Sequence, residues 1–171
     1  NTLSGLIQED EAEAEVFLDE MTKVHRYLLR GDDDYLVPLA NEMKFASSYL
    51  YLTKARFGQA IQAEINLSAD ALVKRLPPLS LQVILENIIY TNVLSKQQPL
   101  VIHINAEGSG HLIIRHSLHE KTIVQNLNVD EGLDNLITKY RLLNMQEIEV
   151  REAKGERIII LPLFDPNTRV A

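Results

Sequence analysis

Apolar residues recur at two different spacings along this chain. A spacing of three or four positions predicts amphipathic helices at residues 16–30, 38–57, 81–94 and 132–143. Shorter apolar stretches predict strands at residues 59–67, 99–105, 111–118, 146–151 and 156–163. In the first of these strands Ile61, Ala63, Ile65 and Leu67 fall on one side, which is typical of a half-buried strand. Residues 119–131 carry no periodic pattern.

The order of these elements predicts an α+β fold. Two amphipathic helices come first, joined by a short acidic loop, and form a helical hairpin. The elements that follow are, in order, a strand, a helix, a β-hairpin, a loop, a second helix and a second β-hairpin. That order predicts a two-layer α/β sandwich, a mixed and mainly antiparallel sheet with helices on one face. We therefore expect a hairpin domain at residues 1–58 and a sandwich domain at residues 59–171.

The two hairpin helices each carry one apolar face. On the first helix this face consists of Phe17, Met21, Val24 and Leu28. On the second, which begins at Pro38 and ends at Gly58, it consists of Leu39, Met43, Ala46, Leu50, Thr53 and Phe57. Hairpins of this kind bury their apolar face against a second copy, so we expect a homodimer built on a four-helix arrangement.

Composition narrows the class of protein. Of the 171 residues, 46% are hydrophobic and 24% charged, as in a globular protein with an ordinary core. Acidic residues outnumber Lys and Arg by 24 to 17, a net charge of −7, so no nucleic-acid partner is expected. The sequence has no cysteine, which excludes disulfides and thiolate metal sites. Its histidines, including His25, His103 and His111, lack the companion ligands that a metal site needs.

The predicted helix at residues 81–94 has the most unusual composition. Pro77 and Pro78 hold its approach extended, and Ser80 is expected to cap it. Glu86 and Asn87 fall just beside its apolar face. Because a buried carboxylate or carboxamide needs a partner, this pair indicates either a polar contact within the core or a ligand site.

The run PPLSLQVILENIIYTNV at residues 77–93 resembles the N-box of sensor histidine kinases in the GHKL (Bergerat-type) ATPase superfamily. The two helices FLDEMTKVHRYLLR and VPLANEMKFASSYLYLTKARFG resemble the segment that follows the phosphoacceptor box in the LytS-like class. Residues 1–3, NTL, match the tail of that box. The resemblance therefore places the phosphoacceptor histidine upstream of Asn1.

The resemblance implies a site for ATP and Mg²⁺. Asn87 would hold Mg²⁺ against the nucleotide phosphates, and Glu86 would lie beside it as a catalytic, base-like group. Tyr90 and Thr91 stand where the family commonly has a basic residue and a histidine, so cationic contacts to phosphate are missing there. No metal other than Mg²⁺ is expected.

Two further segments match the family's nucleotide-binding motifs in part. His116 stands in the place of the adenine-recognising Asp or Asn, with Ser117 beside it. Gly132, Leu133 and Asn135 match the second glycine box, whose first glycine is here Asp130. The carboxylates of Asp130 and Glu131 would suit a helix start as its own cap, but they would repel a triphosphate.

The resemblance leads to two expectations about function. In the first, the chain is the cytoplasmic catalytic part of an inner-membrane two-component sensor kinase, which passes a phosphoryl group to histidine and then to a response regulator. In the second, it is a degenerate pseudokinase or interaction module that keeps the fold with weak or no ATP binding. An unrelated α/β ligand-binding domain would leave the preceding hairpin and the proline pair unexplained.

Overall fold

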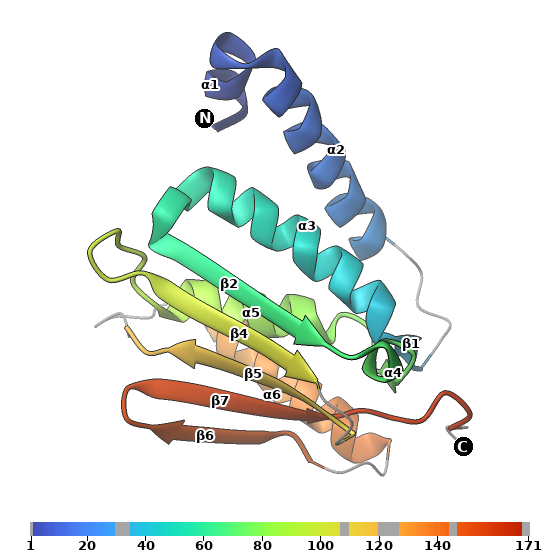
Figure 1. Cartoon of the computed structure of the whole chain (residues 1–171). Helices are drawn as coiled ribbons and strands as arrows, with labels where there is room; N and C mark the ends of the chain where they lie inside the picture. Colours follow the sequence, from blue (N-terminus) through green and yellow to red (C-terminus); the bar gives the residue numbers. More distant parts are fainter. Residues whose placement is uncertain (1, 30–34, 107–109, 120–126, 144–146, 169–171) are drawn as a thin grey trace.

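The computed structural model describes residues 2–29, 35–106, 110–119, 127–143 and 147–168. The helices of this part are α1 (Thr2–Glu9), α2 (Glu11–Leu28), α3 (Leu39–Phe57), α4 (Ala69–Leu72), α5 (Ser80–Thr91) and α6 (Leu127–Leu142). The strands are β1 (Val37–Pro38), β2 (Ile61–Leu67), β3 (Arg75–Leu76), β4 (Leu100–Ala106), β5 (His111–Ser117), β6 (Glu149–Ala153) and β7 (Glu156–Pro162). Figure 1 shows them in sequence colours.

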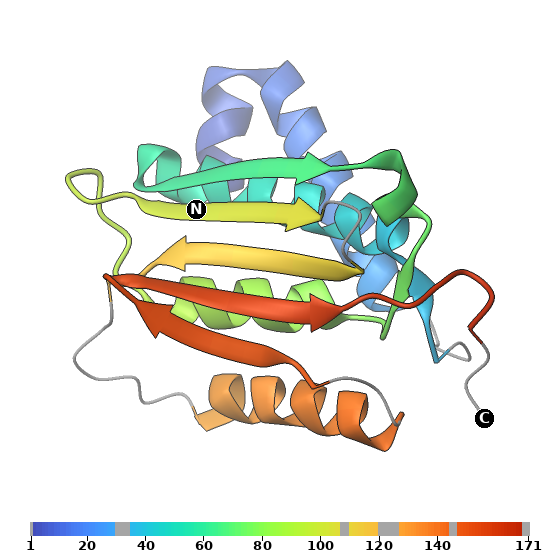
Figure 2. The ribbon, with the colours of Figure 1, turned by 60° about the horizontal axis from the view of Figure 1, so that its bottom comes forward.

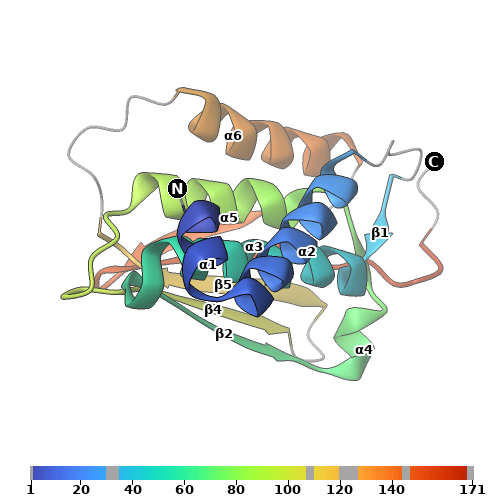
Figure 3. The same cartoon turned by 90° about the horizontal axis from the view of Figure 1, so that it is seen from above.

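A five-stranded sheet in the order β2-β4-β5-β7-β6 forms one layer of the fold (Figure 2). β2 and β4 are parallel, and each other neighbouring pair is antiparallel. Helices α3, α5 and α6 lie on one face of this sheet, and α1 and α2 lie outside α3 (Figure 3). The predicted α+β fold, with a mixed sheet covered by helices on one face, is confirmed.

The core lies between the sheet and its helical layer. Alternate residues of the central strands have no exposed surface, among them Ile102, Ile104, Leu112, Ile114, Ile159 and Leu161. They pack in one hydrophobic cluster with Leu81, Ile84, Leu85 and Ile88 of α5 and with Leu39, Met43, Ala46 and Leu50 of α3. The predicted apolar face of α3 is therefore buried, but it packs against the sheet and α5 of the same chain and not against a second copy. The division of the chain at Gly58 into two domains stays a prediction.

The half-buried character predicted for the first strand is wrong. Only Ile61 of β2 is buried, and Ile65 keeps 40% of its surface exposed. β2 is the edge strand of the sheet, and Gly58–Ala60 form a 3₁₀ turn before it. Alternation along a sequence shows which side chains share a face, but an edge position leaves that face only partly covered.

The first helix begins earlier than its apolar pattern indicated. The structure has α1 at Thr2–Glu9 and starts α2 at Glu11, where Asp10 caps the helix by accepting a hydrogen bond from the Glu13 amide at 3.1 Å. Glu11 and Glu13 lie in the first turn of α2, where the helix dipole favours acidic residues. The acidic stretch is therefore helical. Residue 30, the predicted end of this helix, and the acidic residues 31–34 after it lie outside the described residues.

The cap predicted for α5 is also wrong. Its N-cap residue is Leu79, which has a left-handed backbone (φ 65°) and makes no capping side-chain contact. The Ser80 hydroxyl instead donates a hydrogen bond to the Pro77 carbonyl at 2.6 Å. The start of α5 must therefore be satisfied from elsewhere in the chain.

Glu42 of α3 supplies the missing acceptors. Its side chain is fully buried, and its two carboxylate oxygens accept hydrogen bonds from the amides of Leu79 and Leu81, each at 2.8 Å. The Tyr27 hydroxyl of α2 donates to the same carboxylate. A negative charge at a helix N-terminus is favoured both by the free amides and by the helix dipole. One side chain thus joins α2, α3 and α5.

We predict that Glu42→Ala lowers the free energy of unfolding by about 3 kcal/mol, because it leaves two amides and a phenol without their acceptor. Glu42→Gln keeps one acceptor oxygen and is expected to lose less. Urea unfolding followed by circular dichroism measures both values. Glu15→Ala, at an exposed position of α2, serves as the control and is expected to change stability by less than about 0.5 kcal/mol. Equal losses at positions 42 and 15 would contradict the prediction.

Candidate functional site

Asn87 has a buried carboxamide on α5. The residue is 2% exposed, and its Oδ1 has no hydrogen-bond partner among the described residues. Val83, one helical turn before it on the same face, lies close to Gly132 of α6: a Cβ added to Gly132 would be 3.7 Å from Val83 Cγ1. The face of α5 that carries Asn87 is therefore near α6. An unpaired buried acceptor is costly, so this oxygen is the strongest indication of a ligand site.

Glu86 contacts a different part of the structure. It is half-buried, and its Oε1 accepts a hydrogen bond from Gln82 Nε2 at 3.1 Å along α5. Burial and, to a lesser extent, the negative charge of the Glu86 carboxylate raise the pKa of Tyr49 on α3 to about 12. The Glu86 carboxylate therefore lies near α3. Its catalytic role beside Asn87 stays a prediction.

Tyr90 and Thr91 end the same helix. Tyr90 is 50% exposed. The Thr91 hydroxyl is buried and donates a hydrogen bond to the Asn87 carbonyl at 2.8 Å. Neither side chain carries a positive charge, so neither replaces the cation of the family's motif.

His116 provides a second buried acceptor. It lies on the inner face of β5 with no exposed surface, and its Nδ1 is 2.9 Å from the Ser117 carbonyl oxygen. Because a carbonyl only accepts, Nδ1 carries the proton and the neutral ring presents Nε2 as an acceptor. Nε2 has no partner among the described residues. Burial lowers the pKa of His116, which outweighs the opposing effect of the Ser117 carbonyl.

Ser117 has a structural contact instead. Its hydroxyl oxygen accepts a hydrogen bond from the Val101 amide of β4 at 3.0 Å. This bond holds the end of β5 against the start of β4. The predicted nucleotide contact of Ser117 stays a prediction.

The glycine-box residues lie within α6. The structure begins this helix at Leu127, not at Gly132 as the periodicity indicated. Gly132 is therefore the sixth residue of α6, beyond the first turn, whose amides lack partners within the helix. Leu133 is half-buried and Asn135 is exposed. Residues 120–126, in the aperiodic stretch 119–131 before this helix, lie outside the described part of the chain.

Asn92 is a structural residue that the sequence reasoning did not single out. It is fully buried, and its Nδ2 donates to the Ile88 carbonyl at 2.8 Å while its Oδ1 accepts from the His119 amide at 2.7 Å. The Val93 amide also donates to the His119 carbonyl at 2.7 Å. These bonds fix the end of α5 to the segment that leaves β5. A polar residue directly after an apolar helix was the signal available.

Comparison with known proteins shows which proteins this chain resembles. The sequence model of the family described as "Histidine kinase" matches residues 1–61. The Sensor protein LytS of Bacillus anthracis is 26% identical over an alignment of 182 residues, which covers 94% of this chain and 31% of the relative. The Sensor protein LytS of Bacillus subtilis is 32% identical over 89 residues, covering 52% of this chain and 15% of the relative. The chain thus spans less than a third of the length of these relatives.

A solved structure shares the fold. The cytoplasmic segment of histidine kinase QseC superposes with a TM-score of 0.50 at 18% sequence identity, covering 84% of this chain and 87% of that one. At this identity the likeness concerns the fold alone.

The sandwich of sheet and helices is the GHKL-type fold of histidine kinase catalytic domains. The sequence matches to LytS indicate which class of histidine kinase the chain resembles. The chain is similar in sequence to the LytS sensor proteins over most of its length, and the predicted resemblance to the LytS-like sensor histidine kinases is confirmed.

We predict that His116 makes the protein less stable as the pH falls below about 6.5. The folded chain holds this imidazole neutral with a lowered pKa, so the unfolded chain takes up its proton first and acid favours unfolding. His116→Asn should flatten this part of the curve of unfolding free energy against pH, measured by urea unfolding between about pH 5 and 7.5. His25→Gln, at an exposed position, is the control and should leave the slope unchanged. Parallel curves for the wild type and the His116→Asn variant would contradict this assignment.

Proposed function

We propose that the chain is the nucleotide-binding catalytic part of a two-component sensor histidine kinase. ATP and Mg²⁺ bind between α5 and the segment that leads into α6. The γ-phosphoryl group passes to a histidine outside this sequence and then to a response regulator. The observation that carries this proposal is the buried Asn87 Oδ1, which has no partner among the described residues.

The side chains present fit a magnesium–nucleotide complex. Mg²⁺ prefers oxygen ligands and takes few of them from the protein, because phosphates and water complete its shell. Asn87 Oδ1 offers one such ligand from α5. When bound, the metal would neutralise charge on the phosphates. On β5, His116 Nε2 is an acceptor for the amino group of adenine.

A second candidate function is supported by different observations. Gly132 lies inside α6, so its amide is not among those free to bind phosphate. Tyr90 and Thr91 supply no cation, and Glu86 interacts on the α3 side. These features favour a degenerate module that keeps the fold but signals by conformation.

The assembly and location are part of the proposal. The hairpin of α2 and α3 forms a homodimer in the whole protein, and the apolar residues that α2 leaves exposed, Val16 and Leu18, support this. Residues 1–58 serve dimerisation and phosphotransfer, and residues 59–171 serve catalysis. The catalytic part lies in the cytoplasm, attached to the inner membrane by other parts of the protein. Among the described residues, no helix is both long and apolar enough to cross a membrane.

We predict that the chain binds a non-hydrolysable ATP analogue in the presence of Mg²⁺, and that Asn87→Ala weakens this binding about tenfold or more, because one charge-assisted contact is lost. Isothermal titration calorimetry with and without Mg²⁺ measures the effect. Removing Mg²⁺ should weaken binding to the wild type and leave the variant unchanged. Asn66→Ala, at an exposed position of β2, is the matched control. If the chain does not bind the analogue at millimolar concentration, the proposed kinase activity is overturned and the second candidate, a degenerate module, is favoured.

If the unmodified chain does not bind nucleotide, the variant Asp130→Gly with His116→Asp tests the second candidate. We expect affinity for Mg²⁺ and the ATP analogue to appear, because a repelling carboxylate is removed and a stronger acceptor for adenine is added. Calorimetry measures the gain, and circular dichroism checks folding. A folded double variant that still fails to bind would show that these two positions are not the cause.

A further inference from the structure

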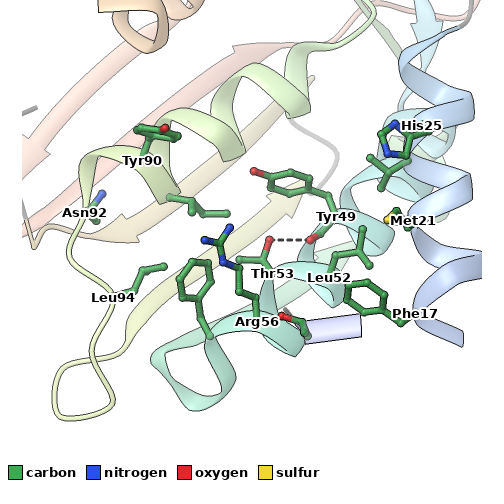
Figure 4. Close-up of a pocket in the computed structure, with 14 residues that line it drawn as sticks. Phe17, Met21, His25, Tyr49, Leu52, Thr53, Arg56, Tyr90, Asn92 and Leu94 are labelled. Carbon is green, nitrogen blue, oxygen red and sulfur yellow. Dashed lines mark hydrogen bonds between the residues drawn. The ribbon is translucent and has the colours of Figure 1, made fainter. Parts of the chain in front are cut away.

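A large pocket lies between the helical hairpin and the end of α5 (Figure 4). Its volume is about 730 Å³, within the range of sites that hold small organic molecules. Residues of α2, α3 and α5 line it, as does the segment after α5. The pocket lies on the side of α5 that faces α3. The side of α5 that carries Asn87, which we assign to nucleotide, is near α6.

The walls of the pocket are largely apolar. Phe17, Met21 and Val24 come from α2, Leu52 and Phe57 from α3, and Ile89 and Leu94 from α5 and the segment after it. Figure 4 shows the side chains of Phe17, Met21 and Leu52 gathered at one end, where α2 meets α3. This end is suited to an apolar group.

The charge of the pocket is opposite to that of the chain. The whole chain carries a net charge of −7, yet no aspartate or glutamate among the described residues lines the pocket. Arg56 does, and its guanidinium points toward the centre of the pocket (Figure 4). It lies 5.0 Å from the centre of the Phe57 ring, and no carboxylate in the described part of the chain forms an ion pair with it. Arg56 is an exposed residue, so its guanidinium is accessible, and an arginine beside apolar side chains is a typical anchor for a carboxylate.

A hydrogen-bond donor lines the same pocket as Arg56. Burial raises the pKa of Tyr49 to about 12, so its phenol stays protonated at neutral pH and can donate. The hydroxyl of Thr53 is already used, since it donates to the Tyr49 carbonyl at 2.8 Å. Arg56 and the Tyr49 phenol thus favour an acceptor that carries negative charge, and the Glu86 carboxylate near Tyr49 restricts that acceptor to the Arg56 side of the pocket.

We propose that this pocket binds a small amphipathic carboxylate, an acyl or aryl acid whose carboxylate pairs with Arg56 and whose apolar body packs between α2 and α3. This ligand and this site go beyond the proposed nucleotide function. Because they use different residues, either proposal can fail while the other stands.

Calorimetric titration of the chain with sodium decanoate, below its micelle concentration, tests the proposal. We expect saturable binding of one decanoate per chain. Arg56→Gln should weaken it at least about tenfold, because the ion pair is lost. The matched control is Lys54→Gln, which makes the same change of charge on α3 at a residue that does not line this pocket.

A second variant tests the cavity independently of charge. Leu52→Trp fills the apolar end of the pocket and should weaken decanoate binding while Arg56 remains. Circular dichroism and urea unfolding check that each variant is folded. Decyltrimethylammonium, which has the same alkyl chain and the opposite charge, should bind at least about tenfold more weakly than decanoate.

Four results would overturn the proposal. They are no saturable decanoate binding, unchanged affinity in folded Arg56→Gln, unchanged affinity in folded Leu52→Trp, and equal affinity for the cationic probe. Sedimentation over a range of protein concentrations tests another occupant. Decanoate binding that disappears as a dimer forms would assign the pocket to a second copy of the chain and also overturn the proposal.

Discussion

The buried carboxylate of Glu42 is the interaction on which the position of α5 depends. α5 begins after a left-handed Leu79 and has no capping side chain of its own. Its first amides are instead bound by a residue of α3, thirty-seven and thirty-nine positions away in sequence. A charge buried this deeply is stable only when its oxygens are saturated with donors, and here two amides and the Tyr27 hydroxyl provide them. The start of α5 is therefore held against α3.

At the start of α5 the amides of Leu79 and Leu81 are bound by Glu42 of α3, whereas in the middle of α5 the Asn87 carboxamide oxygen is left without a partner among the described residues. Glu42 shows that this core can meet the hydrogen-bonding needs of a buried polar group. Asn87 Oδ1 and His116 Nε2, on α5 and β5, are buried acceptors that the described residues leave without a partner. Native cores hold few such atoms, and each of them calls for a partner such as a water molecule, an ion or a ligand. The unpaired Asn87 oxygen is therefore a structural reason to expect a ligand there, in addition to the sequence motif.

The sequence predicted those features that depend on local pattern. The helical faces of α2 and α3, the limits of α3 between Pro38 and Gly58, and the class of the fold follow from periodicity and turn residues. The start of α6 did not follow, because residues 127–131 have no apolar period and their helical state depends on tertiary context.

The contacts of Glu42 and Asn92 could not be predicted at all. Each joins segments far apart in the chain, and nothing in the surrounding sequence names the partner. The cap assigned to Ser80 was wrong for the same reason, since a distant carboxylate competes for those amides better than a local hydroxyl. Likewise, the sequence placed Glu86 next to Asn87 but could not show that the two side chains act toward different helices.

Because β2 and β4 pair in parallel, α5, which lies between them in the sequence, is also part of the connection between the two strands. Parallel neighbours must be joined by a segment that returns across the sheet, and here that segment includes α5. The connection required by topology is thus the same piece of chain that presents Asn87. A chain of this fold needs this helix to build its sheet whether or not it transfers a phosphoryl group. Similarity in this region can therefore follow from the architecture alone.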